Sequence, residues 1–177
     1  MSVKRQQAAL LIDHTCRLTA VSAAPRDVFD KARVWAAAGL VLAATLLIVG
    51  SFLDWVSVEH LPETVPADQA ERAEPFNGFD VGDGYVTGGA GIAIAFCAAM
   101  LVVRTRSSFA WAAFVSAMIA GAIAMSDYRS IDQVFEDFQG IGKGISPGIG
   151  LTLVAAGALL GMVSAIGGAA ATPNEAG

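Results

Sequence analysis

One stretch of the chain decides its fold: residues Val34 to Leu53 read VWAAAGLVLAATLLIVGSFL. This stretch contains no Asp, Glu, Lys, Arg or His. A helix of about 20 residues, rising 1.5 Å per residue, is as long as the hydrocarbon core of a bilayer is thick, about 30 Å. The stretch therefore predicts a transmembrane helix.

Three further stretches of the chain have the same character, at residues 86–103, 109–125 and 148–169. The 177 residues are 55% hydrophobic and only 15% charged, whereas a soluble domain is about 25% charged. Ala and Gly are abundant and strand-like alternation is absent, which favours helices over a membrane barrel. The sequence predicts an all-α integral membrane protein, with a four-transmembrane-helix bundle over residues 34–169.

The basic residues predict how the bundle is oriented. Eight of the 11 Lys and Arg residues lie before the first span or, as Arg104 and Arg106, between the second and third spans. Twelve of the 16 Asp and Glu residues lie in the other two connections. Because Lys and Arg near span ends favour the cytoplasm, we expect a multi-pass protein of the bacterial plasma (inner) membrane. The basic segment 1–33 and the tail 170–177 are then both cytoplasmic.

The flanks of the first span refine this topology. Residues 1–33 are polar, so the first span is expected to act as a retained signal anchor. Trp35 and Trp55 bracket it and are expected to lie at the two membrane–water interfaces. Residues 3–24 mix apolar and basic side chains, which leaves two interpretations open: a partly ordered basic tail, or a helix that lies on anionic lipid.

The first outer loop, residues 54–85, is rich in Pro and acidic residues and ends in GFDVGDG, residues 78–84. We call this heptapeptide the glycine–aspartate box. Its glycines and aspartates permit tight turns, and the residues expected to form a structural turn are Gly78, Asp80, Gly82, Asp83 and Gly84. A calcium site on the two aspartates was weighed, but their spacing does not match an EF-hand loop. Glu59 and His60 are too few ligands for zinc, so no metal site is expected.

The second outer loop, residues 126–147, is expected to contain a short amphipathic outer helix. Ser130 can cap this helix, and Gly140 would end it. The residues at helical spacing on its apolar face are Ile131, Val134, Phe135 and Phe138. A helix of about ten residues is too short to span a bilayer. We expect its apolar face to lie on the membrane or against a partner, so these four residues are partner-interface candidates.

Small residues recur every fourth position in the last span, as Gly157 and Gly161. Small-xxx-small faces let helix backbones approach closely, which is how spans associate in lipid. This pattern fits internal packing of the bundle and, as an alternative, an interface with another protein. Gly157 and Gly161 are therefore also kept as partner-interface candidates.

The spans contain few side chains that could bind an ion or a polar solute or take part in catalysis. Their polar side chains are hydroxyls that can bond to their own helix, whereas carriers and channels place ionisable or strongly polar groups inside the membrane. The sequence has no nucleophile–base set and no phosphate-binding glycine loop. We expect neither an enzyme nor a cofactor, and no nucleic-acid partner. Other integral membrane subunits and membrane lipids are the partners expected.

A few features together resemble a group of known proteins. They are the basic N-terminal tail, the Trp-flanked first span, the glycine–aspartate box and the opening of the fourth span, PGIGL at residues 147–151. This arrangement resembles small four-span membrane proteins of actinobacteria over roughly residues 34–169. The shared motifs are turn and packing motifs, so the resemblance implies a class of protein and no catalytic or ligand residue.

Two functional hypotheses follow from this sequence. The first is a non-catalytic accessory or assembly subunit of a larger membrane complex in the cell envelope. By analogy, an Mce-type lipid importer or a respiratory supercomplex would be its host. The second is a stand-alone or homo-oligomeric membrane protein that binds lipid or another apolar solute, since an apolar ligand would leave no charged signature in the spans.

Overall fold

The structure is a computed structural model that describes residues 26–58, 77–137 and 145–172. Most of the described chain is helical, and the elements follow one another as α2 (Arg26–Phe52), β1 (Val56–Val58), α4 (Gly78–Val81), α5 (Asp83–Arg104), α6 (Ser107–Asp137), β2 (Ile145–Pro147) and α7 (Ile149–Ala170). The sequence-based expectations for residues 3–24, for Glu59 and His60 and for Phe138 lie outside the described residues.

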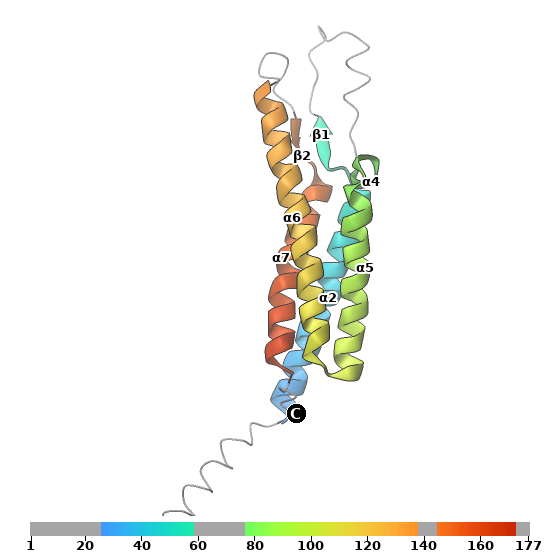
Figure 1. Ribbon diagram of the computed structural model, residues 1–177, viewed down its shortest axis with the longest axis vertical. Helices are drawn as coiled ribbons and strands as arrows, with labels where there is room; N and C mark the ends of the chain where they lie inside the picture. Colours follow the sequence, from blue (N-terminus) through green and yellow to red (C-terminus); the bar gives the residue numbers. More distant parts are fainter. Residues whose placement is uncertain (1–25, 59–76, 138–144, 173–177) are drawn as a thin grey trace, which may run out of the picture.

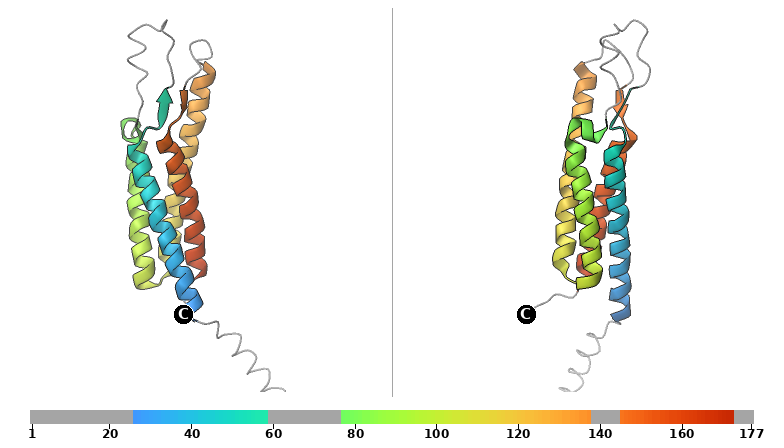
Figure 2. Two further views of the ribbon diagram at one scale, coloured as in Figure 1. Left: turned by 180° about the vertical axis from the view of Figure 1, so that it is seen from behind. Right: turned by 90° about the vertical axis from the view of Figure 1, so that its right-hand side faces the viewer.

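The four long helices form one elongated antiparallel bundle (Figure 1). Helix α2 packs against α5 and α7, and α6 packs against the same two helices, so α2 and α6 lie diagonally opposite (Figure 2). A two-residue turn at Thr105 and Arg106 joins α5 to α6, and Thr105 adopts the left-handed conformation that ends α5. We call the end that holds this turn the Arg33 end. The opposite end, with α4 and the strands, is the Trp55 end.

Each long helix contains a stretch that is long and apolar enough to cross a membrane. These stretches are Val28–Phe52, Asp83–Arg104, Ser107–Ser130 and Ile149–Ala170. The prediction of four such helices in a helical bundle is therefore confirmed. Most of their bounds lie outside the apolar runs of the sequence, although α2 ends at Phe52 and α7 begins at Ile149, each one residue inside the expected run.

The bundle core is built largely from small side chains. A Cβ placed on Gly161 would lie 3.1 Å from the Cβ of Ala117, 3.5 Å from that of Ala43 and 3.8 Å from Cδ1 of Ile94, so Gly161 faces all three other helices. A Cβ on Gly157 would lie 3.0 Å from the Ala43 carbonyl oxygen of α2. Close backbone approach of this kind holds helices together in lipid. Both glycines are buried inside this chain, as the internal packing of the bundle requires.

The expected short outer helix is not a separate element. Helix α6 continues unbroken from its apolar part to Asp137, and the Ser130 hydroxyl donates to the Ser126 carbonyl at 3.0 Å instead of capping a new helix. The apolar run ends at Met125, but residues 126–137 contain neither Pro nor Gly, so nothing there stops the helix. With 31 residues against 22 in α5, α6 is roughly 13 Å longer, and Figure 1 shows it extending beyond the Trp55 end.

Candidate functional site

Trp55 organises the end of the bundle from which α6 extends. The chain turns back after α2 ends at Phe52, which leaves the indole only 2% exposed. Its Nε1–H donates to the Gly50 carbonyl at 2.9 Å, and carbonyls in the last turn of a helix have no partner within the helix. The Trp55 ring therefore covers the end of α2 and does not face outward from the bundle.

Glycines surround Trp55 and the end of α2. A Cβ on Gly78 would lie 2.5 Å from Cε2 of the indole, and a Cβ on Gly150 would lie 2.5 Å from the Leu53 carbonyl oxygen. A Cβ on Gly148 would overlap the carbonyl oxygen of Asp54. These approaches are closer than any side chain allows. We call Gly50, Trp55, Gly78, Gly148 and Gly150 the Trp55 cap.

Backbone hydrogen bonds tie the cap to the start of α7. The Gly148 N–H donates to the Trp55 carbonyl at 2.7 Å, and the Gly150 N–H donates to the Asp54 carbonyl at 2.9 Å. Strands β1 and β2 continue this contact as an antiparallel ribbon, with Val56 opposite Pro147. Proline donates no hydrogen bond and suits the end of such a ribbon. The cap therefore joins segments that are about 90 residues apart in the chain.

The glycine–aspartate box forms α4 and the turn into α5. The Asn77 side chain accepts from the N–H groups of Phe79 at 2.9 Å and Asp80 at 3.1 Å. In return, the Asp80 carboxylate accepts from the Asn77 N–H at 3.2 Å, which completes a capping box. Gly82 then takes a φ of 94°, in the left-handed region that favours glycine. Asp80 is thereby engaged in a structural hydrogen bond.

Gly84 and Asp83 have different roles in the same box. A Cβ on Gly84 would lie 2.5 Å from the Gly78 carbonyl carbon, so α5 can begin directly against α4 only without a side chain there. Asp83 is the first residue of α5, where a negative charge is favourable beside the positive end of the helix dipole. The box thus sets the entry of the chain into α5.

Two hydroxyl groups join α2 to α5 just beneath the cap. The oxygens of Ser51 and Thr87 lie 2.8 Å apart, and both side chains are buried. Each hydroxyl also has a carbonyl of its own helix within reach, Leu47 at 2.7 Å from Ser51 and Asp83 at 3.1 Å from Thr87, so one hydroxyl donates to the other and the second donates to its own helix. Both polar groups are therefore satisfied within the core, as buried hydroxyls must be.

Asp127 of α6 and Asp83 of α5 place their carboxyl groups next to each other. Oδ2 of Asp127 is buried and has no hydrogen-bond partner. Among residues 26–58, 77–137 and 145–172, no Lys, Arg or His forms an ion pair with either carboxylate. Two like charges this close repel each other. Packing of α5 against α6 holds the two carboxyl groups together despite this repulsion.

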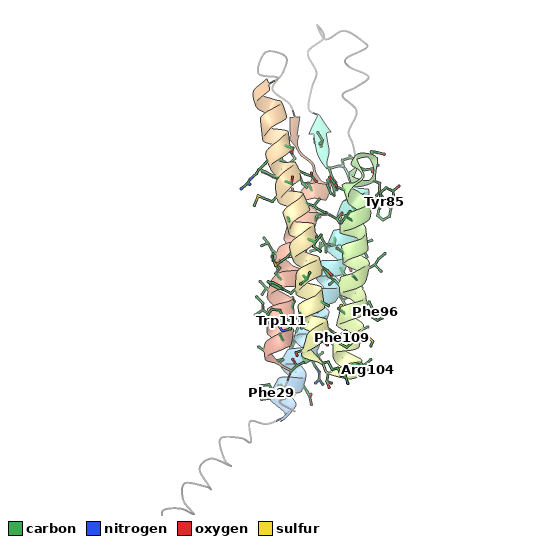
Figure 3. The ribbon with its side chains drawn as sticks, in the orientation of Figure 1. Phe29, Tyr85, Phe96, Arg104, Phe109 and Trp111 are labelled. Atoms are coloured by element: carbon green, nitrogen blue, oxygen red, sulfur yellow. The ribbon has the colours of Figure 1, made fainter. Side chains whose placement is uncertain are left out.

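A row of three aromatic rings covers the outside of the same end. The Phe52 and Phe79 ring centroids are 4.6 Å apart, and the Phe79 and Tyr85 centroids are 4.8 Å apart in an edge-to-face arrangement. Phe52 and Tyr85 are exposed, and Figure 3 shows Tyr85 pointing away from α5. Phe52 and Tyr85 therefore present exposed rings of the kind that suits a membrane–water interface.

The remaining candidates lie farther along α6. Ile131, Val134 and Phe135 belong to the last two turns of this helix, beyond Ser130, where the apolar stretch ends. In the part of the chain that the structure describes, no three His, Cys, Asp or Glu side chains gather as a metal site would require. The chemistry of this end is that of a fixed, acidic, hydrogen-bonded surface with a projecting helix.

The sequence pointed to the turn residues of this end but not to the contacts among them. Trp55, Asp127 and the Ser51–Thr87 pair were not identified as parts of one site. The glycines before Trp55 and at the start of α7 are the signal that could have indicated a close backbone approach.

No known protein family, no curated protein and no solved structure gives a significant match to this chain.

Proposed function

We propose that this protein is a non-catalytic accessory or assembly subunit of a larger membrane complex in the cell envelope. Its four apolar helices cross the bacterial plasma membrane, with both termini in the cytoplasm and the Trp55 end outside. The distribution of basic residues supports this orientation, because the Arg33 end holds Arg104 and Arg106 beside the span ends.

One observation carries the proposal: α6 continues beyond the apolar part of the bundle as a helix. Because most helical stability in proteins comes from packing against other elements, the outer part of α6 needs a neighbouring element to pack against. Strand β2 runs beside α6, and the Trp55 cap fixes β2 in place through the ribbon. A projecting helix on a fixed base is the form of a docking element, and its apolar positions Ile131, Val134 and Phe135 recur at helical spacing.

The kind of host is proposed by analogy alone. By that analogy, the complex is an Mce-type lipid importer or a respiratory supercomplex. In either setting, the outer segment of α6 contacts an extracytoplasmic part of the host, and the lipid-facing sides of the spans contact its membrane subunits.

A gentle detergent pull-down of a C-terminally tagged copy from its native membrane tests the proposal. We expect stoichiometric recovery with subunits of one membrane assembly, identified by mass spectrometry. A lone or self-associated species would contradict the proposal. If that species retained a stoichiometric apolar ligand, the alternative of a stand-alone lipid-binding protein would replace it.

Phe135→Ser separates docking from folding in the same assay. We expect this variant to insert and accumulate normally but to lose the host subunits. Gln133→Ser, two residues away on the same helix, is the matched control and should keep them. If Phe135→Ser is absent from the membrane, the outer part of α6 belongs to the fold of this chain and the docking role is wrong.

The orientation has a test of its own. A reporter that is active only outside the cytoplasm should work when it is fused after Ala67 or Gln139. The same reporter should be inactive when it is fused after Arg106. The reverse pattern would place the Trp55 end in the cytoplasm.

A further inference from the structure

Arg33 occupies a position on the buried side of α2. The buried residues Ala36 and Ala37 lie one helical turn farther along the same stripe, and the buried Leu40 lies two turns farther. The Arg33 side chain is only 17% exposed, although it belongs to the most hydrophilic residue type in the chain. An arginine in line with a core stripe needs partners for its donors.

The partners of Arg33 within the chain are incomplete. Its Nη2 donates to Oδ1 of Asp30 at 2.8 Å, but its Nε is buried and has no hydrogen-bond partner among the described residues. The Asp30 side chain is 60% exposed, so this ion pair is largely screened by solvent. Arg33 therefore retains positive charge and hydrogen-bonding capacity that the described residues do not use.

The antiparallel bundle brings two more arginines to the level of Arg33. Gly168 of α7 lies against a residue of each of the other three long helices. A Cβ on Gly168 would lie 2.9 Å from Cδ2 of Leu101 (α5), 3.5 Å from the Cβ of Ala36 (α2) and 3.7 Å from that of Ala110 (α6). These four residues form one layer of the bundle. One turn closer to the Arg33 end are Arg33 on α2, Arg104 at the end of α5 and Arg106 before α6. We call these three residues the arginine rim.

The surroundings of the rim are basic and aromatic. Lys31 is exposed at the same end, and Asp30 is the acidic side chain that the structure describes there. Trp35 and Trp111 are exposed on the outside of the bundle, and Figure 3 shows Trp111 and Phe29 at the end that carries Arg104. Exposed Trp side chains lie at the level of lipid headgroups in membrane proteins.

We propose that the arginine rim binds the phosphate of an anionic phospholipid in the inner leaflet. Guanidinium groups bind phosphate through paired hydrogen bonds, and basic sites between spans on the cytoplasmic side take anionic headgroups. The net positive charge of the rim complements a lipid whose headgroup is negative overall and not zwitterionic. The proposal rests on the orientation given under the proposed function, but it does not depend on a host complex.

Lipid binding to the purified full-length protein tests the rim. The protein in neutral detergent is titrated with phosphatidylglycerol and, separately, with phosphatidylcholine, and bound lipid is counted by native mass spectrometry. The double variant Arg104→Gln/Arg106→Gln changes two exposed residues and should fold normally. We expect it to bind phosphatidylglycerol about tenfold more weakly, the effect of losing one charged hydrogen bond or more.

Arg129→Gln is the matched control, because Arg129 is an exposed arginine on α6 beyond the middle of the bundle, toward the Trp55 end. It should bind phosphatidylglycerol as the unchanged protein does. Arg33→Gln should weaken binding as the double variant does, with the added prediction that it lowers selectivity for phosphatidylglycerol over phosphatidylcholine. Equal binding by all variants would overturn the rim as a lipid site.

Two further outcomes separate the source of the phosphate and the side of the membrane. If inorganic phosphate displaces the lipid at equal concentration, the rim is a site for free phosphate and the lipid proposal is wrong. If the reporters place the Arg33 end outside, the inner-leaflet assignment is wrong even where lipid binding persists. A failed pull-down, by contrast, would leave both lipid results unchanged and would count only against the accessory-subunit role.

Discussion

The two ends of the bundle are closed in different ways. At the Trp55 end, backbone meets backbone: Gly148 and Gly150 donate to carbonyls that follow α2, and a buried indole covers the end of α2. At the Arg33 end, α5 finishes at Arg104, Arg106 precedes α6, and Arg33 of α2 is only partly paired among the described residues. The Trp55 end is closed by hydrogen bonds within the chain, whereas the Arg33 end retains positive charge that a phosphate can neutralise.

This difference predicts opposite sensitivities to substitution. Contacts through glycine backbones leave no room for a methyl group, so small additions at the Trp55 end should cost a large part of the stability. Exposed charges at the Arg33 end contribute little to stability, so their replacement should change binding and leave the fold intact. The predictions below test the first half of this comparison, from the largest effect to the smallest.

Gly148→Ala should have the largest effect. Its Cβ would overlap the Asp54 carbonyl oxygen, and the displaced backbone would lose the hydrogen bond from the Gly148 N–H to the Trp55 carbonyl at 2.7 Å. We expect a loss of about 3 kcal/mol, at the upper end of the overpacking range. Thermal unfolding in detergent, followed by circular dichroism, measures it.

Gly89→Ala and Gly167→Ala are the controls for this substitution. No atom lies within 4 Å of a Cβ at either position. Both lie inside long helices, where alanine is favoured over glycine by roughly 0.5–1 kcal/mol. Both variants should be as stable as the unchanged protein or slightly more stable. If all three variants lose stability equally, the backbone contact at Gly148 is not the cause.

Trp55→Phe should have an intermediate effect. It keeps an aromatic ring in the cap but removes the hydrogen bond from Nε1 to the Gly50 carbonyl, so we expect a loss of about 1–2 kcal/mol. Trp35→Phe is the matched control at the other end, because Trp35 is 77% exposed and should change stability by less than about 0.5 kcal/mol. Equal losses of stability in the two variants would mean that the buried Trp55 stabilises the fold no more than the exposed Trp35 does.

The sequence predicted the four long helices because each has an apolar run of the required length. Its errors came where long-range contacts decide the structure. Trp55 follows an apolar run in the same way that Trp35 opens one, yet one is buried and the other exposed. Only the return of the chain at Gly78 and Gly148 distinguishes them, and such a return is a tertiary contact that no local pattern encodes.

The end of α6 shows a second limit of sequence patterns. The polar residues after Met125 predict a break before a new helix capped by Ser130, but the helix needs only the absence of a breaker to continue. The pairing of Asp83 with Asp127 follows from that continuation, since both residues face the seam between α5 and α6 only if α6 keeps its helical phase. A polar stretch alone therefore does not mark the end of a helix.

Ser51 and Thr87 test whether side chains add to the backbone closure of the Trp55 end. In a double-mutant cycle of Ser51→Ala and Thr87→Val, we expect a coupling energy of about 0.6 kcal/mol, the average for hydrogen bonds between spans. The two hydroxyl oxygens lie 2.8 Å apart and have no other side-chain partner among the described residues. A coupling of zero would mean that each hydroxyl is satisfied by its own helix alone.

Asp127→Asn should have the smallest effect, and the opposite sign. The substitution removes a like charge beside Asp83 and provides an amide that can donate to that carboxylate, so we expect a gain of about 0.5 kcal/mol after allowance for solvent screening. The gain should shrink in high salt, because salt screens the repulsion that it relieves. Asp80→Asn is the control of contrasting sign: its carboxylate accepts from the Asn77 N–H, so this variant should lose stability. If Asp127→Asn were also destabilising, the Asp127 carboxylate would have to make a favourable contact, and the backbone contacts of the Trp55 end would not be its only source of stability.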